Sequence, residues 1–195
     1  MVTRLILSID RRNTSDQAME VVDLAINFHE RGVVGVDICG DPSIGDVSIY
    51  RAALARAKGA GLGITIHFAE VPQPPTKAEL ETMLELRPDR LGHVIHVPRS
   101  IKEIIAQRRL GLELCLSCNV KLKMMEGSYE DHHFRYWRET GCPITLCVCS
   151  SIFSQKGSDA NDARLMTLEW LEVRCQMSMR WWLNTLTFLL KRSMS

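Results

Sequence analysis

The sequence lacks an excess of charge of either sign. Its 24 Lys and Arg residues nearly balance its 23 Asp and Glu residues, which gives a formal net charge of +1 over 195 residues. Nucleic-acid binding depends on a basic surface that neutralises phosphates, so no nucleic-acid partner is expected. With 46% hydrophobic residues, the composition suits one soluble globular domain.

Long hydrophobic runs are also missing. The longest one near the end, WWLNTLTFLL, is about half of the roughly twenty residues that a membrane span needs and includes Asn184. No membrane partner is expected. The opening MVTRLILSID has no signal-peptide pattern, so the seven cysteines are expected to be reduced thiols in a cytoplasmic protein.

Short β-branched runs alternate with amphipathic stretches up to residue 147. The runs are VTRLILSID (2–10), VVGVDIC (33–39), GITIHFA (63–69), RLGHVIHV (90–97), GLELCLSC (111–118) and PITLC (143–147). Between them, AMEVVDLAINFHER has helical spacing, TKAE (76–79) and SIKE (100–103) fit capping boxes, and Gly32, Gly61, Gly111 and Gly141 stand at expected helix ends.

This alternation predicts an α/β fold with a parallel sheet covered by helices. A glycine-rich phosphate loop is missing after the first strand, which favours a TIM-type (β/α)8 barrel over a doubly wound sheet. The unit comprises residues 1–147. Residues 148–195 carry three of the four tryptophans and four of the nine methionines without a clean period and are predicted to be an unrelated tail.

Reactive groups of such folds gather at the carboxyl ends of strands. His67 and Glu70 stand at the end of the third run, and His93 lies in the fourth. A neutral imidazole can bind zinc, and a nearby carboxylic acid can protonate a substrate. His93 could then hold an attacking water or take its proton. The alternative is a hydrogen-bonded structural histidine and a solvated glutamate.

Two further motifs favour structural interpretations. Cys115 and Cys118 form a CxxC, but residues three apart on a strand point to opposite faces, so joint chelation is not expected. A cysteine-based zinc or redox protein would require the motif to lie in a turn. His132 and His133 are adjacent, and a helix surface is the simpler interpretation.

The strand ends, in order, resemble the adenosine deaminase-like branch of the adenosine/AMP deaminase family, which acts on N6-methyl-AMP. The similar blocks are LILSIDRR, GVDICGDP, IHFAEVP, PDRLGHVIHVP, GLELCLSCNV and SYEDHHF. The resemblance covers about residues 2–147 and implies a monomeric zinc-dependent aminohydrolase barrel whose ligand is a purine nucleoside or nucleotide.

The resemblance also assigns roles. It implies that His67 is a metal ligand, that Glu70 donates a proton to purine N1, and that His93 is the catalytic histidine near the attacking water. Asp10 and Gly40 match positions that contact the substrate. The preferred substrate among adenosine, AMP and N6-methyl-AMP stays open.

The departures from the family pattern concern the metal. The family's first two strands, with an HxH metal pair, are not matched here, and Val148-Cys149-Ser150 stands where the family has T-D-D. Of four protein ligands only His67 remains, and substitution by Cys147 or Cys149 is not expected, because one histidine and an unplaced thiolate do not fix a catalytic geometry.

The tail has an explanation at the level of codons. Val-Cys can be encoded by GTATGT, a splice-donor sequence, so Val148 to Ala163 can represent a retained intron followed by out-of-frame coding. In the shifted frame, residues 164–167 can encode T-D-D. We therefore expect an incomplete, inactive deaminase barrel. The alternative is a non-catalytic purine-nucleotide-binding protein that keeps Asp10, Gly40 and Asn119 as contacts.

Overall fold

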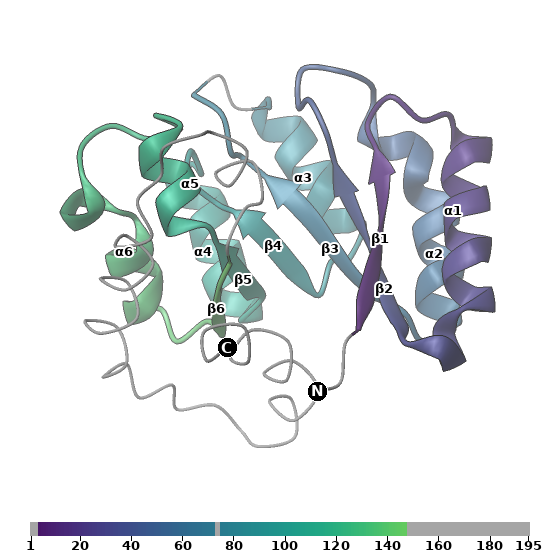
Figure 1. The fold of residues 1–195 in the computed structure, drawn as a ribbon. Coiled ribbons are helices and arrows are strands. Elements are labelled where there is room, and N and C mark those ends of the chain that lie inside the picture. Colours follow the sequence, from purple (N-terminus) through teal and green to yellow (C-terminus); the bar gives the residue numbers. More distant parts are fainter. Residues whose placement is uncertain (1–3, 73–74, 148–195) are drawn as a thin grey trace.

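Six parallel strands form one sheet whose spatial order follows the sequence (Figure 1). The computed structural model describes residues 4–72 and 75–147. Its strands are β1 Leu5–Asp10, β2 Val33–Cys39, β3 Gly63–Phe68, β4 Arg90–His93, β5 Gly111–Leu114 and β6 Ile144–Leu146. A doubly wound sheet would reverse its strand order at a switch point. The consecutive order is that of a sector of a (β/α) barrel, as predicted.

Helices connect the strands and cover one side of the sheet (Figure 1). They are α1 Ser15–Asn27, α2 Arg51–Gly59, α3 Lys77–Glu85, α4 Arg99–Arg108, α5 Leu116–Lys121 and α6 Phe134–Glu139. Short 3₁₀ turns span His29–Arg31 (η1), Val47–Tyr50 (η2) and Tyr129–Asp131 (η3). No helix in the described part of the chain has the length and apolar character needed to cross a bilayer.

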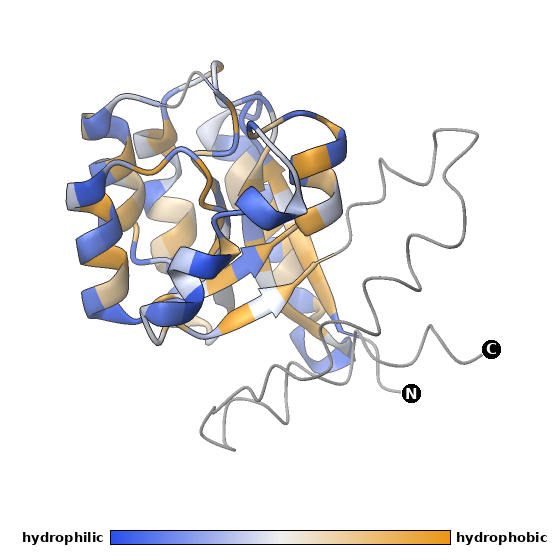
Figure 2. Ribbon diagram, turned by 90° about the vertical axis from the view of Figure 1, so that its left-hand side faces the viewer, coloured by the Kyte–Doolittle hydropathy of each residue, from blue (hydrophilic) through white to orange (hydrophobic). Residues whose placement is uncertain are grey.

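The two faces of the sheet differ in polarity. Ile64, Ile66 and Phe68 of β3 are buried in the core shared with the helices. Because successive side chains of a strand alternate, Thr65 and His67 face the other side. Neighbouring strands share this arrangement, and Figure 2 shows mainly hydrophobic strands beside helices banded with hydrophilic residues.

A charged pair holds the polar face together across strands. Glu113 of β5 accepts a hydrogen bond from Thr65 of β3 at 3.3 Å and pairs with Arg90 of β4 at 3.0 Å. Both side chains of the ion pair are about four-fifths buried, with exposed fractions of 21% and 18%. Polar side chains on this face make it better suited to bind a ligand than to pack against another apolar layer.

Strand boundaries differ from the predicted ones where the backbone becomes left-handed. β3 ends at Phe68 because Ala69 has φ 49°, and β4 ends at His93 because His93 and Val94 have φ 62° and 47°. Left-handed φ values cannot continue a strand. The prediction of strand over residues 111–118 was wrong in its second half, since β5 ends at Leu114 and α5 begins at Leu116.

Helix signals were right in part. Thr76 caps α3 by accepting from Glu79 N–H, as TKAE predicts. SIKE does not open a helix, because α4 begins at Arg99 and has Pro98 as its cap without a side-chain bond. Gly111 starts β5 instead of ending a helix, and Arg109 takes the left-handed cap at φ 51°. The predicted tail, residues 148–195, lies outside the described residues, which end at Cys147.

Candidate active site

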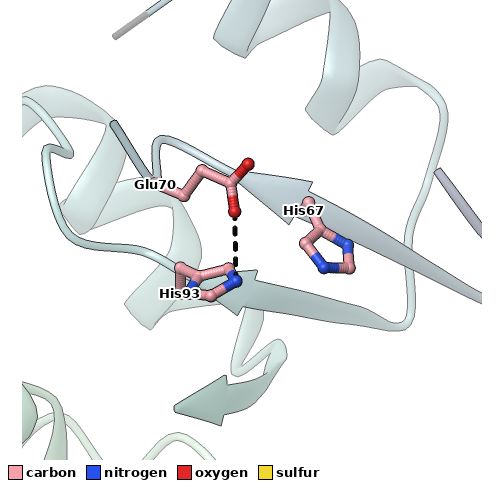
Figure 3. A group of neighbouring side chains, drawn as sticks. All are labelled: His67, Glu70 and His93. Atoms are coloured by element: carbon pink, nitrogen blue, oxygen red, sulfur yellow. Dashed lines mark ion pairs between the residues drawn. The ribbon is translucent and has the colours of Figure 1, made fainter. Parts of the chain in front are cut away.

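Three predicted side chains meet at the carboxyl ends of β3 and β4 (Figure 3). The register pairs His67 with Gly92 and Phe68 with His93. One ligand atom each of His67, Glu70 and His93 lies within 4.8 Å of the others, and the two imidazole rings are 5.3 Å apart between centroids. The sequence prediction that these three residues form one cluster agrees with this geometry.

The backbone after β3 turns Glu70 toward His93. Ala69 and Val94 are both left-handed, a conformation that costs a non-glycine residue on the order of 1 kcal/mol and is retained where the surroundings fix it. Two backbone hydrogen bonds do so here, from Val94 N–H to the Phe68 carbonyl at 3.0 Å and from His96 N–H to the Ala69 carbonyl at 2.9 Å. The Glu70 carboxylate then lies 3.1 Å from His93 Nε2.

Asp37 of β2 orients His67 from behind. Its carboxylate lies 3.1 Å from His67 Nδ1, which leaves Nε2 as the ring atom available to a ligand. Burial alone would lower the pKa of His67, but the hydrogen bond and charge of Asp37, with help from Glu70, raise that pKa to about 9. A carboxylate behind an imidazole is the usual support of a metal-binding histidine.

Sequence reasoning missed Asp37. The available signal was a carboxylate inside the otherwise apolar strand GVDIC, because an acid that is only 8% exposed needs a partner.

His93 is held on its other side by Asn119 and His132. Its Nδ1 lies 3.0 Å from the Asn119 side-chain amide, and that amide lies 3.1 Å from His132 Nε2. Asn119 is fully buried and bonded at both ends, so it is not a ligand contact as the binding-protein hypothesis had it. Burial lowers the pKa of His93, which keeps its ring neutral at physiological pH.

The interpretation of His132 and His133 as a helix surface was wrong. They lie between η3 and α6, their rings stack with centroids 4.1 Å apart, and His132 is only 3% exposed. His133 Nε2 donates to the backbone carbonyl of His93 at 2.7 Å. Burial lowers the pKa of His132 to about 3 and that of His133 to about 4. Both are neutral supports of the site.

Asp10 and Gly40 lie together at the ends of β1 and β2. A Cβ at Gly40, which has φ 99°, would come within 3.0 Å of an Asp10 carboxylate oxygen. Arg12 binds that carboxylate with both Nε and a terminal nitrogen, at 2.8 and 2.7 Å. Hydrogen bonds from Arg12 lower the pKa of Asp10 to about 2. A ligand that uses Asp10 would share it with this guanidinium.

The CxxC lies at the start of a helix and not on a strand. Cys115 caps α5, whereas Cys118 is buried on that helix with its sulfur 3.7 Å from Met124. The strand premise of that prediction was wrong, because Cys115 directly precedes α5 and Cys118 lies on it, so the absence of joint chelation stays a prediction. Cys115 instead hydrogen-bonds the Cys147 thiol, and this bond together with burial raises the pKa of Cys147.

This fold and site define a class, the (β/α) barrels that gather two histidines and a carboxylate at their strand ends. The family model for adenosine deaminase matches residues 1–156. The chain therefore belongs to the adenosine deaminase family.

Relatives within that family are named deaminases. The N6-mAMP deaminase of Arabidopsis thaliana is 39% identical over 145 residues, which cover 74% of this chain and 40% of the relative. The N6-methyl-AMP deaminase of Danio rerio is 37% identical, with coverage of 74% and 43%. A crystal structure of Arabidopsis ADAL complexed with IMP has a TM-score of 0.71 and 37% identity, covering 78% of this chain and 44% of that one. The chain thus spans about two fifths of the length of these relatives.

Proposed function

We propose that this chain carries the acid–base half of a zinc-dependent aminohydrolase site that converts N6-methyl-AMP to IMP. The observation that carries the proposal is the cluster of His67, Glu70 and His93, with ligand atoms within 4.8 Å. Support for the substrate comes from relatives named for N6-methyl-AMP and from the IMP-bound solved structure.

Each residue has a role in the proposed reaction. Glu70, in its acid form, protonates purine N1, which makes C6 electron-poor. His93 holds the attacking water at the same strand ends. Asp10 and Gly40 contact the purine ring. Water adds to C6 to form the C6–O bond, and the C6–N bond then breaks. One proton of the water leaves on the methylamine, and the other restores the proton that Glu70 gave to N1. Protonation by a positioned acid contributes about a hundredfold or more in rate.

The residues fit a zinc ion on His67. Its Nδ1 is occupied by Asp37, so Nε2 faces the cluster, and the donor type suits zinc. Zinc, when bound, supplies the Lewis acid that makes water a competent nucleophile near neutral pH. Among the described residues, His67 is the one cluster imidazole not already bonded to Glu70.

We infer that turnover by the 195-residue chain is far below that of the longer relatives. Catalytic zinc sites normally use three protein ligands. The cluster in the described residues offers His67, together with Glu70 and His93, which are bonded to each other. Zinc held by fewer ligands is held weakly and without fixed geometry.

The test uses the purified chain with zinc and N6-methyl-AMP, with binding measured by calorimetry and IMP by chromatography. Zinc-dependent nucleotide binding that is lost in His67→Ala supports the proposed site. Glu70→Gln should keep that binding and abolish any IMP release. Binding that is indifferent to zinc and to His67 would contradict the proposal.

The second candidate is a purine-nucleotide-binding protein without turnover. It is favoured by one observation, that Glu70 and His93 bind each other and so are not free to act on a substrate until the pair separates. Binding of N6-methyl-AMP with unchanged affinity in Glu70→Gln, and no IMP at any zinc concentration, would favour this candidate.

A further inference from the structure

A continuous hydrogen-bonded row leads from Glu70 through three buried side chains behind the site. It runs from Glu70 through His93 and Asn119 to His132, with separations of 3.1, 3.0 and 3.1 Å. The row ends at the backbone N–H of Phe134, which donates to His132 Nδ1 at 3.0 Å. A backbone N–H can only donate, so the far end of the row has a fixed direction.

That direction determines where the proton of His132 lies. Nδ1 accepts from Phe134 and therefore carries no hydrogen. The ring is neutral, since burial lowers its pKa to about 3, and a neutral imidazole carries one proton. That proton is on Nε2, and the neighbouring atom of Asn119 must accept it.

The proton on His132 Nε2 determines which end of the Asn119 side-chain amide faces His93. The structure places Asn119 Oδ1 toward His93 and Nδ2 toward His132. In that orientation His132 would accept hydrogen bonds at both ring nitrogens, from Phe134 N–H and from the Asn119 NH₂. A neutral imidazole cannot do this, because one of its nitrogens carries a proton. The oxygen and nitrogen of a side-chain amide are assigned from such hydrogen-bond balance. The balanced state has the Asn119 oxygen toward His132 and its NH₂ toward His93 Nδ1.

We propose that Asn119 and His132 are positioning residues that hold neutral His93 as the Nε2–H tautomer. Its Nδ1 accepts from Asn119, and its Nε2–H donates toward Glu70 and the pocket. The His93 backbone is held in the same place by His133, which donates to its carbonyl at 2.7 Å. The significance for catalysis rests on the proposed function: His93 then holds the attacking water as a donor and does not remove its proton.

The test reads the tautomer directly by ¹⁵N NMR of the histidine rings in the metal-free full chain near pH 8, with His93 signals assigned from His93→Gln. The wild-type protein should show a protonated Nε2 and an unprotonated Nδ1 at His93. A protonated Nδ1 in the folded wild-type protein would overturn the proposal without any variant.

Asn119→Asp makes the prediction sharper. A carboxylate only accepts, so Nδ1 of His93 should gain a proton, whether the ring changes tautomer or becomes charged. His96 and His133 are internal controls, because their Nε2 atoms face the carbonyls of Met124 and His93 at 2.7 Å and should stay protonated. An unchanged His93 in folded Asn119→Asp would contradict the role of Asn119.

His132→Phe keeps the volume and frees the amide to turn, so both tautomers of His93 should appear. A pure Nε2–H signal in folded His132→Phe would contradict the role of His132. Because no substrate or metal is needed, a chain that shows the Nε2–H tautomer but whose nucleotide binding is indifferent to zinc and to His67 counts against the proposed function alone.

Discussion

Asp37 is the residue that makes His67 a candidate ligand rather than a plain core histidine. Its carboxylate is buried and aimed at His67 Nδ1, so removal of its charge changes the ring that would bind zinc. The same contact raises the pKa of His67 to about 9. Zinc binding must therefore displace a proton from a ring that is well suited to hold one.

Asp37→Asn should weaken zinc binding by about 10- to 100-fold, the usual effect of removing such a support. Competition titration with a chromophoric chelator measures it. The matched control is Asp41→Asn, because Asp41 is exposed and bonded to Ser43. Equal zinc affinities of Asp37→Asn and wild type would refute this role.

The buried pair His132 and His133 should make the protein sensitive to acid. Their folded pKa values, about 3 and 4, lie below the unfolded value of about 6.5. Between these limits the unfolded state binds more protons, so stability is retained above pH 6.5 and falls as the pH drops toward 4.

Urea unfolding measured at several pH values from 7 to 4 checks this. His133→Gln keeps a donor for the His93 carbonyl but does not titrate, so its stability should fall less steeply over that range. A variant whose pH profile overlays that of wild type would show that His133 is not held neutral.

At the scale of residues, the sequence allowed the three cluster residues to be predicted but not the side chains that hold them in place. His67, Glu70 and His93 were predictable because polar residues at strand ends stand out from apolar runs. Asp37 stood out as a carboxylate in an apolar strand, but its partner was not predictable, and neither was the role of His132, since both depend on contacts across strands or between a loop and a helix. Adjacent histidines on a regular helix would diverge, and only the break between η3 and α6 lets these two stack.

At the scale of elements, strand pairing determines how close the site residues come. Gly35 of β2 pairs with Gly63 of β3, and an added Cβ at Gly35 would lie 2.6 Å from the Gly63 carbonyl oxygen. Gly63 itself has room for a side chain, because an added Cβ there would lie 3.5 Å from the Val34 carbonyl oxygen, an ordinary van der Waals distance. The spacing that joins Asp37 to His67 thus depends on one glycine.

Gly35→Ala should destabilise the protein by about 1–3 kcal/mol, the range for overpacking a tight interior, whereas Gly63→Ala should cost much less. Denaturant unfolding of the two variants measures the difference. Equal midpoints would mean that the strands can separate without cost.

The order and type of the elements followed from the alternation of β-branched runs and amphipathic stretches. The ends of β3 and β4 did not, because nothing in the residue types of Ala69, His93 or Val94 predicts a left-handed backbone. Those φ values arise from the hydrogen bonds that join the two strand ends. The beginning of α5 was missed because the residue types of LCLSC are compatible with either a strand or a helix.

At the scale of the molecule, the described sheet has two outer strands, β1 and β6, each paired on one side. Leu5 on β1 is 54% exposed. Strand edges with exposed apolar residues promote association between chains, so we expect this edge to lower the solubility of the protein.

Leu5→Lys should therefore raise the temperature at which light scattering sets in. Leu24→Lys, on the surface of α1 and 49% exposed in wild type, removes a similar apolar side chain away from any strand and should have little effect. The opposite ranking would indicate that the strand edge is not the site of association.

The tail remains a proposal that the gene can test. If residues 148–163 are intron-derived, genomic DNA across Cys147 contains a GT…AG interval followed by ACT GAT GAC. A continuous coding sequence without that interval would remove the explanation.

The central claim is that His67, Glu70 and His93 can perform purine deamination. Since the chain spans about two fifths of its relatives, the most direct measurement uses a chimera in which residues 4–147 replace the matching segment of the Arabidopsis N6-mAMP deaminase. The rate of IMP release from N6-methyl-AMP is then compared with that of the same chimera carrying Glu70→Gln. We predict zinc-dependent IMP release that Glu70→Gln abolishes; a folded, zinc-loaded chimera that releases no IMP, or releases it equally well with Glu70→Gln, would contradict the account.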